Sequence, residues 1–134
     1  MKPVTVLLVD DNSIFLRTLT RFLEEEGRDE VVVIGVAGSG EEALTQARDL
    51  RPQAILLDLR MPGMSGLEAL PLLRKALPET AIIVLSIMDP DAYRGPALAA
   101  GADDFVCKAA LDTDLLPAIR RLKKCHVPKF PSVT

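Results

Sequence analysis

The chain has 134 residues, a formal net charge of −3, 49% hydrophobic residues and 26% charged residues. This length suits one compact domain, and this composition excludes disordered, coiled-coil and disulfide-scaffold proteins. The small negative charge provides no broad basic surface, so we expect no direct contact of this chain with nucleic acid. The apolar runs are too short for a membrane span or a signal peptide, which predicts a cytoplasmic protein without membrane contact.

The two cysteines, Cys107 and Cys125, lack the spacing of a metal site. Cys125 is followed by His126, but no second ligand pair accompanies them. We therefore expect structural or incidental thiols.

Apolar runs rich in branched residues alternate with amphipathic stretches. In chain order, the predicted strands span residues 4–9, 31–37, 54–57, 81–85 and 105–107. The predicted helices between and after them end near Gly27, span 40–50, run from Leu67 to Leu77, occupy 97–102 and occupy 114–124. This alternation predicts an α/β fold, namely a flavodoxin-like (βα)5 doubly wound, five-stranded parallel sheet of order 2-1-3-4-5.

Prolines fall in three of the helical segments, at positions 71 and 117 inside predicted helices and at position 96 directly before the predicted fourth helix. A proline in a helix interior removes a backbone hydrogen bond and costs about 3 kcal/mol. Pro96 therefore predicts that residues 88–95 are irregular and that the fourth helix has only about two turns. We expect a kink in the third helix, and an N-cap at Thr113 or Asp114 would let the fifth accommodate its proline.

Polar residues follow four strands that are adjacent in this order: Asp10 and Asp11 after strand 1, Asp58 after strand 3, Ser86 after strand 4 and Lys108 after strand 5. Ligands of doubly wound sheets bind beyond the carboxyl ends of the strands. Converging carboxylates repel one another and attract a cation, and Mg²⁺ prefers oxygen ligands. We expect Asp11 and Asp58 to bind Mg²⁺ directly, Asp10 to act through water, and the backbone carbonyl of Arg60 to add an oxygen.

A phosphoryl group would account for the two remaining polar residues. An ammonium such as that of Lys108 pairs well with phosphate, and the Ser86 hydroxyl could donate to a phosphate oxygen. Because a carboxylate can act as a nucleophile, Asp58 is the predicted acceptor, giving an aspartyl phosphate.

Each of these residues also has an ordinary structural interpretation. Residues 10–12 could cap the first helix, and Asp58 could begin a turn. Ser86 could bond to the backbone at a strand end, and Lys108 could be a solvated loop lysine. The occurrence of the whole set at one sheet edge favours the phosphoryl site.

The segments "LLVDDN", "LLDLRMPGMSG", "VLS" and "AAGADDFVCK" together resemble the receiver domain of two-component response regulators. The resemblance covers about residues 4–124, so we assign 1–124 to a receiver domain and 125–134 to a C-terminal tail or linker. "GVAGSGEEAL" and Ala109 are most similar to the NarL/FixJ-type branch, which usually carries a C-terminal helix-turn-helix of the LuxR type.

This resemblance implies that Asp58 accepts phosphate from a sensor histidine kinase, with Mg²⁺ held by Asp10 and Asp11. It implies that Lys108 pairs with the phosphoryl group, and that the chain catalyses only its own phosphorylation and dephosphorylation. Arg60, two positions after Asp58, is expected to be exposed or to govern water access.

The resemblance also implies a switch in which Ser86 moves toward the phosphoryl group. Phe105, the switch aromatic, then fills the vacated space, although it could also be an ordinary core residue. The fourth helix, fifth strand and fifth helix would carry the output, which is expected to be control of transcription, with DNA bound only through a further domain. Because one new ion pair cannot supply the full switching energy, we expect a populated active state before phosphorylation, or a homodimer.

Two other functional classes remain open. The first is a receiver-like protein-interaction module that does not switch. The second is a magnesium-dependent phosphohydrolase, which is disfavoured because no loop is long enough to build a substrate pocket. Flavin binding is weaker still, since the first turn would present carboxylates to an anionic phosphate.

Overall fold

A computed structural model describes residues 2–125, with side chains described through Leu122. Its strands are β1 (Val4–Val9), β2 (Val31–Ala37), β3 (Ala54–Asp58), β4 (Ala81–Ser86) and β5 (Asp104–Cys107). Its α-helices are α1 (Ser13–Glu26), α2 (Gly40–Leu50), α3 (Gly66–Ala76), α4 (Pro90–Ala100) and α5 (Leu111–Cys125), and a 3-10 turn, η1 (Lys108–Ala110), precedes α5.

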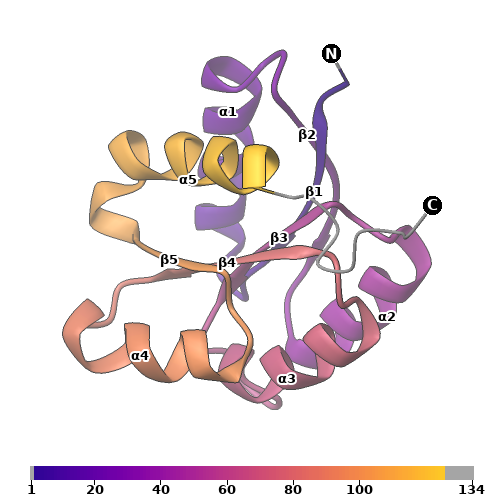
Figure 1. Cartoon of the computed structure of the whole chain (residues 1–134), viewed down its shortest axis with the longest axis vertical. Helices are drawn as coiled ribbons and strands as arrows, with labels where there is room; N and C mark the ends of the chain where they lie inside the picture. The colour runs from indigo at the N-terminus through magenta and orange to yellow at the C-terminus, as the bar shows by residue number, and fades with distance from the viewer. Residues whose placement is uncertain (1, 126–134) are drawn as a thin grey trace.

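The strands of the described region form one parallel sheet of order β2-β1-β3-β4-β5, which confirms the predicted fold. Figure 1 shows α1 and α5 on one face of the sheet and α2, α3 and α4 on the other. Parallel pairing brings all the strand ends to one edge. Asp58 pairs with Leu85, for example, so that Ser86 follows on the neighbouring strand.

Two apolar clusters cover the two faces of the sheet, because successive residues of a strand point to opposite sides. Phe105 belongs to the cluster under α2, α3 and α4. Its neighbour Val106 belongs to the cluster under α1 and α5. The strands that carry the polar terminal residues are therefore held from both sides.

Side-chain caps begin the first four α-helices close to the carboxyl ends of the preceding strands or in the loops after them. The capping residues are Asn12, Ser39, Ser65 and Asp89. At Ser65 the cap is reciprocal, since Glu68 accepts from the Ser65 amide while Ser65 accepts from the Glu68 amide. Each cap satisfies backbone donors that a helix start leaves unpaired.

The prediction of a short fourth helix was wrong. Residues 90–100 are helical, so the irregular segment expected over 88–95 is replaced by most of α4. Pro90 occupies the first helical turn, where the missing N–H costs nothing, and Asp89 caps the helix by accepting from the Asp91 amide. Pro96 lies within the helix and is exposed, so its ring projects to solvent.

The expected start of the fifth helix was also wrong. Instead of capping, Thr113 lies in the first turn of α5 and donates its hydroxyl to the Ala110 carbonyl. The turn η1 leads directly into the helix, so Pro117 falls in its seventh position and is only partly exposed. Pro71 likewise lies inside α3, and the predicted kink there stays a prediction.

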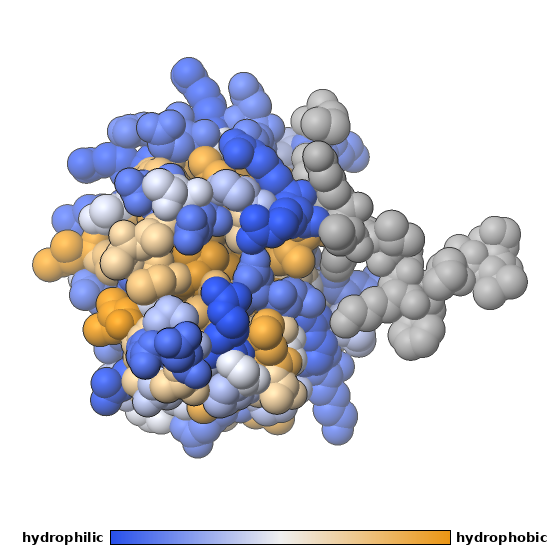
Figure 2. Space-filling model, turned by 60° about the vertical axis from the view of Figure 1, so that its left-hand side comes forward, coloured by the Kyte–Doolittle hydropathy of each residue, from blue (hydrophilic) through white to orange (hydrophobic). Residues whose placement is uncertain are grey.

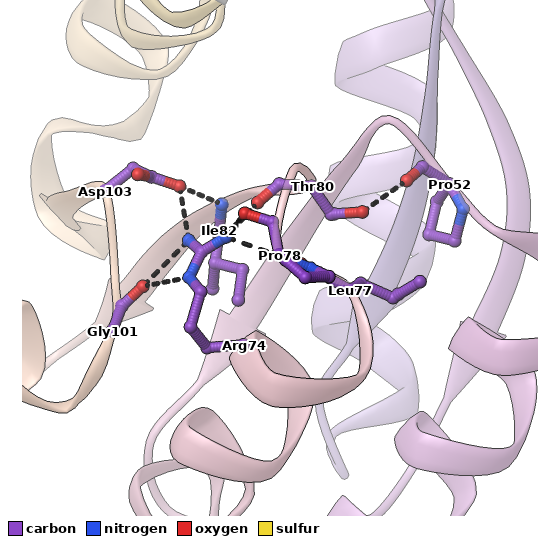
Figure 3. Close-up of polar contacts among 8 residues, drawn as sticks. All are labelled: Pro52, Arg74, Leu77, Pro78, Thr80, Ile82, Gly101 and Asp103. Carbon is purple, nitrogen blue, oxygen red and sulfur yellow. Dashed lines mark hydrogen bonds and ion pairs between the residues drawn. The ribbon is translucent and has the colours of Figure 1, made fainter. Parts of the chain in front are cut away.

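The guanidinium of Arg74 joins the end of α3 to the end of α4 (Figure 3). It donates to the carbonyls of Pro78, Thr80 and Gly101, at 3.0, 2.7 and 2.8 Å. It also contacts Asp103 Oδ2 at 2.7 Å, and the same carboxylate oxygen accepts from the Ile82 amide. The planar donors of arginine suit such a set of fixed acceptors.

Within residues 2–125, no helix is long and apolar enough to cross a membrane. The tail assigned to 125–134 lies outside the described residues, except for the backbone of Cys125. The Cys107 thiol is free and partly buried.

Candidate functional site

Three carboxylates meet at the edge where β1 and β3 end. Asp10, Asp11 and Asp58 each offer an oxygen, and these oxygens lie within 4.8 Å of one another. The pairing of Val9 with Leu57 explains this, because it places the following residues of both strands side by side. The three predicted acids therefore form one cluster.

The acids differ in their exposure to water. Asp10 and Asp58 are only 3% and 8% exposed, whereas Asp11 is exposed. Burial raises the pKa of Asp58 to about 6, the neighbouring Asp10 adds to the rise, and Lys108 opposes it. The site thus concentrates negative charge in a poorly solvated place, which favours a cation.

Lys108 supplies a cation of the chain's own. Its Nζ lies 2.7 Å from Asp10 Oδ2 and 3.5 Å from Asp58 Oδ1, and its side chain is 14% exposed. The alternative of a solvated loop lysine is therefore wrong. The amine stands beside the predicted acceptor, at the start of η1.

The capping alternative holds for Asn12 rather than for the acids. Asn12 Oδ1 accepts from the amides of Ile14 and Phe15, at 3.0 and 3.1 Å. Asp10 Oδ1 accepts from the Asn12 amide at 2.9 Å, which orients the carboxylate. Asp11 remains available at the surface of the cluster.

Ser86 is 1% exposed at the end of β4. Its Oγ accepts from the Met88 amide at 3.0 Å, so the backbone role considered for this residue is real. The same hydroxyl retains a proton that it can donate. The Met88 amide fixes the position of this hydroxyl, and no sequence pattern indicated Met88 as a site residue.

Phe105 is 2% exposed and packs in the core beneath α4. Arg94 of α4 lies over its ring, 5.6 Å from the centroid, and donates to the Phe105 carbonyl at 3.1 Å. Arg94 also lies 3.6 Å from Asp104. The predicted switch aromatic is thus linked to α4 through one arginine.

The loop after Asp58 returns tightly to the site. Leu59 and Met61 are buried, whereas Arg60 between them is exposed. This agrees with the first of the two expectations for Arg60, an exposed position. The Gly66 amide donates to the Leu59 carbonyl at 3.1 Å, and a Cβ at Gly66 would lie 1.8 Å from the Asp58 carbonyl oxygen. A side chain at position 66 would therefore displace the backbone of the acceptor.

The start of α2 holds the other side of this loop. The Gly40 amide donates to the Met64 carbonyl, and Glu41 Oε1 accepts from the Met64 amide, both at 3.1 Å. Gly63 has a positive φ of 73°, which suits the third position of a Pro-Gly turn. Sequence reasoning missed Glu41, because no local pattern relates it to a loop that is distant along the chain.

Phe15 is a further site residue that was missed, after Met88 and Glu41. Its ring centroid lies 4.1 Å from Lys108 Nζ. Its position in the first turn of α1, directly after the segment that carries the acids, was a usable signal.

Two isoleucines near the strand ends are largely exposed to solvent. Ile14 and Ile87 are 73% and 76% exposed, and they follow the carboxyl ends of β1 and β4. Figure 2, which turns the left-hand side of Figure 1 forward, shows apolar residues among polar ones on the face that it draws.

The chain matches the family model of the response regulator receiver domain over residues 6–120. It is 36% identical over 117 residues to the response regulator GacA of Pseudomonas viridiflava, covering 87% of this chain and 54% of that protein. It is 39% identical over 120 residues to the nitrate/nitrite response regulator NarL of Escherichia coli K12, covering 90% and 55%. The chain thus spans about half the length of these curated relatives.

A solved structure agrees in fold. The two-component response regulator of the LuxR family from Aurantimonas sp. SI85-9A1 superposes with a TM-score of 0.84 at 28% identity, covering 91% of this chain and 86% of that one. The family match extends over most of the chain and includes every residue of the acid cluster. The chain belongs to the response regulator receiver domain family, with relatives of the NarL and LuxR type.

Proposed function

We propose that this chain is a phosphoacceptor: a sensor histidine kinase transfers a phosphoryl group to Asp58. The observation that carries the proposal is the position of Asp58, which lies in a three-acid cluster with Lys108 Nζ 3.5 Å from its Oδ1. Phosphoryl transfer depends mostly on positioning and charge neutralisation, and this set of side chains is suited to both.

In the transfer, a carboxylate oxygen of Asp58 attacks phosphorus while the bond from phosphorus to the kinase imidazole nitrogen breaks. The electron pair of that bond returns to the imidazole, and an aspartyl phosphate forms. Asp58 must be ionised to attack. Burial and Asp10 raise its pKa to about 6, whereas Lys108 lowers it and so favours the ionised form. Lys108 can then turn its donors to the new phosphoryl oxygens.

Asp11 and Asp58 would hold Mg²⁺ directly, with Asp10 acting through water and the Arg60 carbonyl adding an oxygen. The donor set fits a hard cation, because three carboxylate oxygens lie within 4.8 Å of one another. When bound, Mg²⁺ would neutralise charge on the transferred group.

The proposed output is a change in the face formed by α4, β5 and α5, which would control transcription through a further domain. Ser86 would move from its contact with the Met88 amide and donate its hydroxyl proton to a phosphoryl oxygen. Phe105 already lies in the core at 2% exposure, so a large inward rotation is not required. This position supports a populated active arrangement before phosphorylation, with any homodimer adding to it.

The test is incorporation of phosphoryl from acetyl phosphate, followed by intact mass, with and without Mg²⁺. We expect one phosphoryl group, dependent on Mg²⁺ and lost in Asp58→Asn. Equal labelling of Asp58→Asn would reject the site. Beryllofluoride, a phosphoryl analogue, tests the output: unchanged amide resonances across α4, β5 and α5 would favour the non-switching interaction module.

A further inference from the structure

The Lys108 ammonium has an aromatic neighbour in addition to its two carboxylates. The centroid of the Phe15 ring lies 4.1 Å from Nζ, a distance typical of a cation–π contact. We propose that Phe15 is a positioning residue, which holds the Lys108 amine in place for the phosphoryl group on Asp58. This inference deepens the proposed function and rests on it.

Two features fix Phe15 independently of Lys108. Its amide donates to Asn12 Oδ1 at 3.1 Å, within the cap that begins α1. Its side chain is half-buried and packs against the apolar cluster shared by α1 and α5. The ring is therefore in place before any phosphoryl group arrives.

Lys108 needs such a partner because its charge lies on a flexible four-carbon stem. Asp10 is the nearer carboxylate, at 2.7 Å against 3.5 Å for Asp58, so ion pairing alone draws the amine toward Asp10. The ring attracts the same charge without requiring a particular N–H direction. The amine can therefore redirect its donors to phosphoryl oxygens while its contact with Phe15 persists.

Low exposure strengthens this interaction. The Lys108 side chain is 14% exposed, and a cation–π contact gains when the cation is desolvated. A leucine at position 15 would fill much of the same space but would lack a π face. The two roles of Phe15, core packing and positioning, can therefore be separated by substitution.

Phe22 provides the matched control. It lies on α1 about two turns farther along, is half-buried, and packs against the same cluster. Phe22→Leu removes the same atoms from the same helix and the same core. Any difference between the two leucine variants at the site reflects the position of the ring relative to Lys108.

The experiment measures the dissociation constants of beryllofluoride in saturating Mg²⁺, and of Mg²⁺ alone, by calorimetry. Phe15→Leu and Phe15→Met should weaken beryllofluoride binding about threefold to tenfold, with Mg²⁺ affinity changed less than about twofold. Phe22→Leu should leave both constants within about twofold of the parent's. Phe15→Trp, which keeps an aromatic ring, should bind beryllofluoride about as tightly as the parent does. Urea unfolding of each variant provides the stability comparison.

A double-mutant cycle completes the test. In a Lys108→Ala background, Phe15→Leu should have no further effect on the beryllofluoride constant, because the group that it positions is gone. The proposal is overturned if Phe15→Leu binds beryllofluoride as the parent does, or if Phe22→Leu weakens it equally. Failure of the parent to bind the analogue through Asp58, with Asp58→Asn as the comparison, would instead overturn the proposed function.

Discussion

Lys108 Nζ lies closer to Asp10 than to Asp58, at 2.7 Å against 3.5 Å. Asp10 is almost fully buried, so this amine neutralises a carboxylate that has little contact with water. Removing one member of a buried ion pair leaves an uncompensated charge, which is costly.

We therefore expect Lys108→Met to lower the free energy of unfolding by about 2 to 4 kcal/mol in EDTA. Mg²⁺ should reduce the loss, because a bound cation replaces the missing charge. Urea denaturation measures both effects. Arg121→Ala, which removes an ion pair between Asp104 and a 63% exposed arginine, should cost about 0.5 kcal/mol or less. Equal losses of stability in the two variants would contradict the view that Lys108 neutralises a buried carboxylate.

The raised pKa of Asp58 predicts a pH dependence of stability in the absence of metal. Between its ordinary value of 3.8 and about 6, the folded state retains a proton that the unfolded state has released. The parent should therefore lose stability relative to Asp58→Asn as pH rises from about 4 to 6, by about 2 to 3 kcal/mol. Chemical denaturation at several pH values in EDTA measures this difference. A difference that stays constant across this range would show that burial does not raise the pKa.

Gly66 should tolerate no side chain. Gly66→Ala places a Cβ 1.8 Å from the Asp58 carbonyl oxygen, so the acceptor's backbone must move. We expect a loss of about 3 kcal/mol and slower labelling by acetyl phosphate. Gly95→Ala is the control. Apart from its chain neighbours and the backbone of its own helix, no heavy atom of the described residues lies within 4 Å of its added Cβ. That change, inside α4, should raise stability by about 0.5 to 1 kcal/mol.

Glu41 should affect Mg²⁺ affinity from outside the cluster. Its carboxylate holds the Met64 amide at 3.1 Å and so restrains the loop that contains Arg60. If the Arg60 carbonyl is a metal ligand, Glu41→Ala should weaken Mg²⁺ binding about threefold to tenfold, which is within the net contribution of one ordinary hydrogen bond. Calorimetry with Mg²⁺ measures the change.

Glu42→Ala is the matched control for Glu41→Ala. The two residues share the first turn of α2, but Glu42 Oε1 accepts from Gln46 at 3.2 Å instead of holding the loop. Both variants lose one negative charge from the same helix start. A similar loss of Mg²⁺ affinity in both would indicate a general charge effect and would count against a role for the loop.

Arg74→Lys should destabilise the domain, although it keeps the charge. Lysine lacks the planar donors that reach the carbonyls of Thr80 and Gly101 together, and these acceptors are part-buried. We expect a loss of about 2 to 3 kcal/mol in urea unfolding. A loss below about 0.5 kcal/mol would show that one ammonium contact, to Asp103, is sufficient.

The strands and the acid cluster were predictable because both follow from local pattern combined with parallel topology. Asp58, Ser86 and Lys108 are far apart in sequence, yet each directly follows a predicted apolar run. The start of α4 was not predictable from Pro96 alone, because the cost of an interior proline was judged without the cap at Asp89. Phe15 and Glu41 were missed because their contacts arise from the packing of helices against loops, which no single segment encodes.

The Arg74 network has a mechanical consequence for α4. The carbonyl of Gly101, which caps the helix, receives two hydrogen bonds from this guanidinium. The first turn of α4 begins at Pro90, four residues after Ser86, and is capped locally by Asp89. A helix that is held at its C-terminal end can change its angle but cannot move along its axis. We expect events at Ser86 to tilt α4 about Gly101, so that displacement is largest beside the acids and fades toward the pivot.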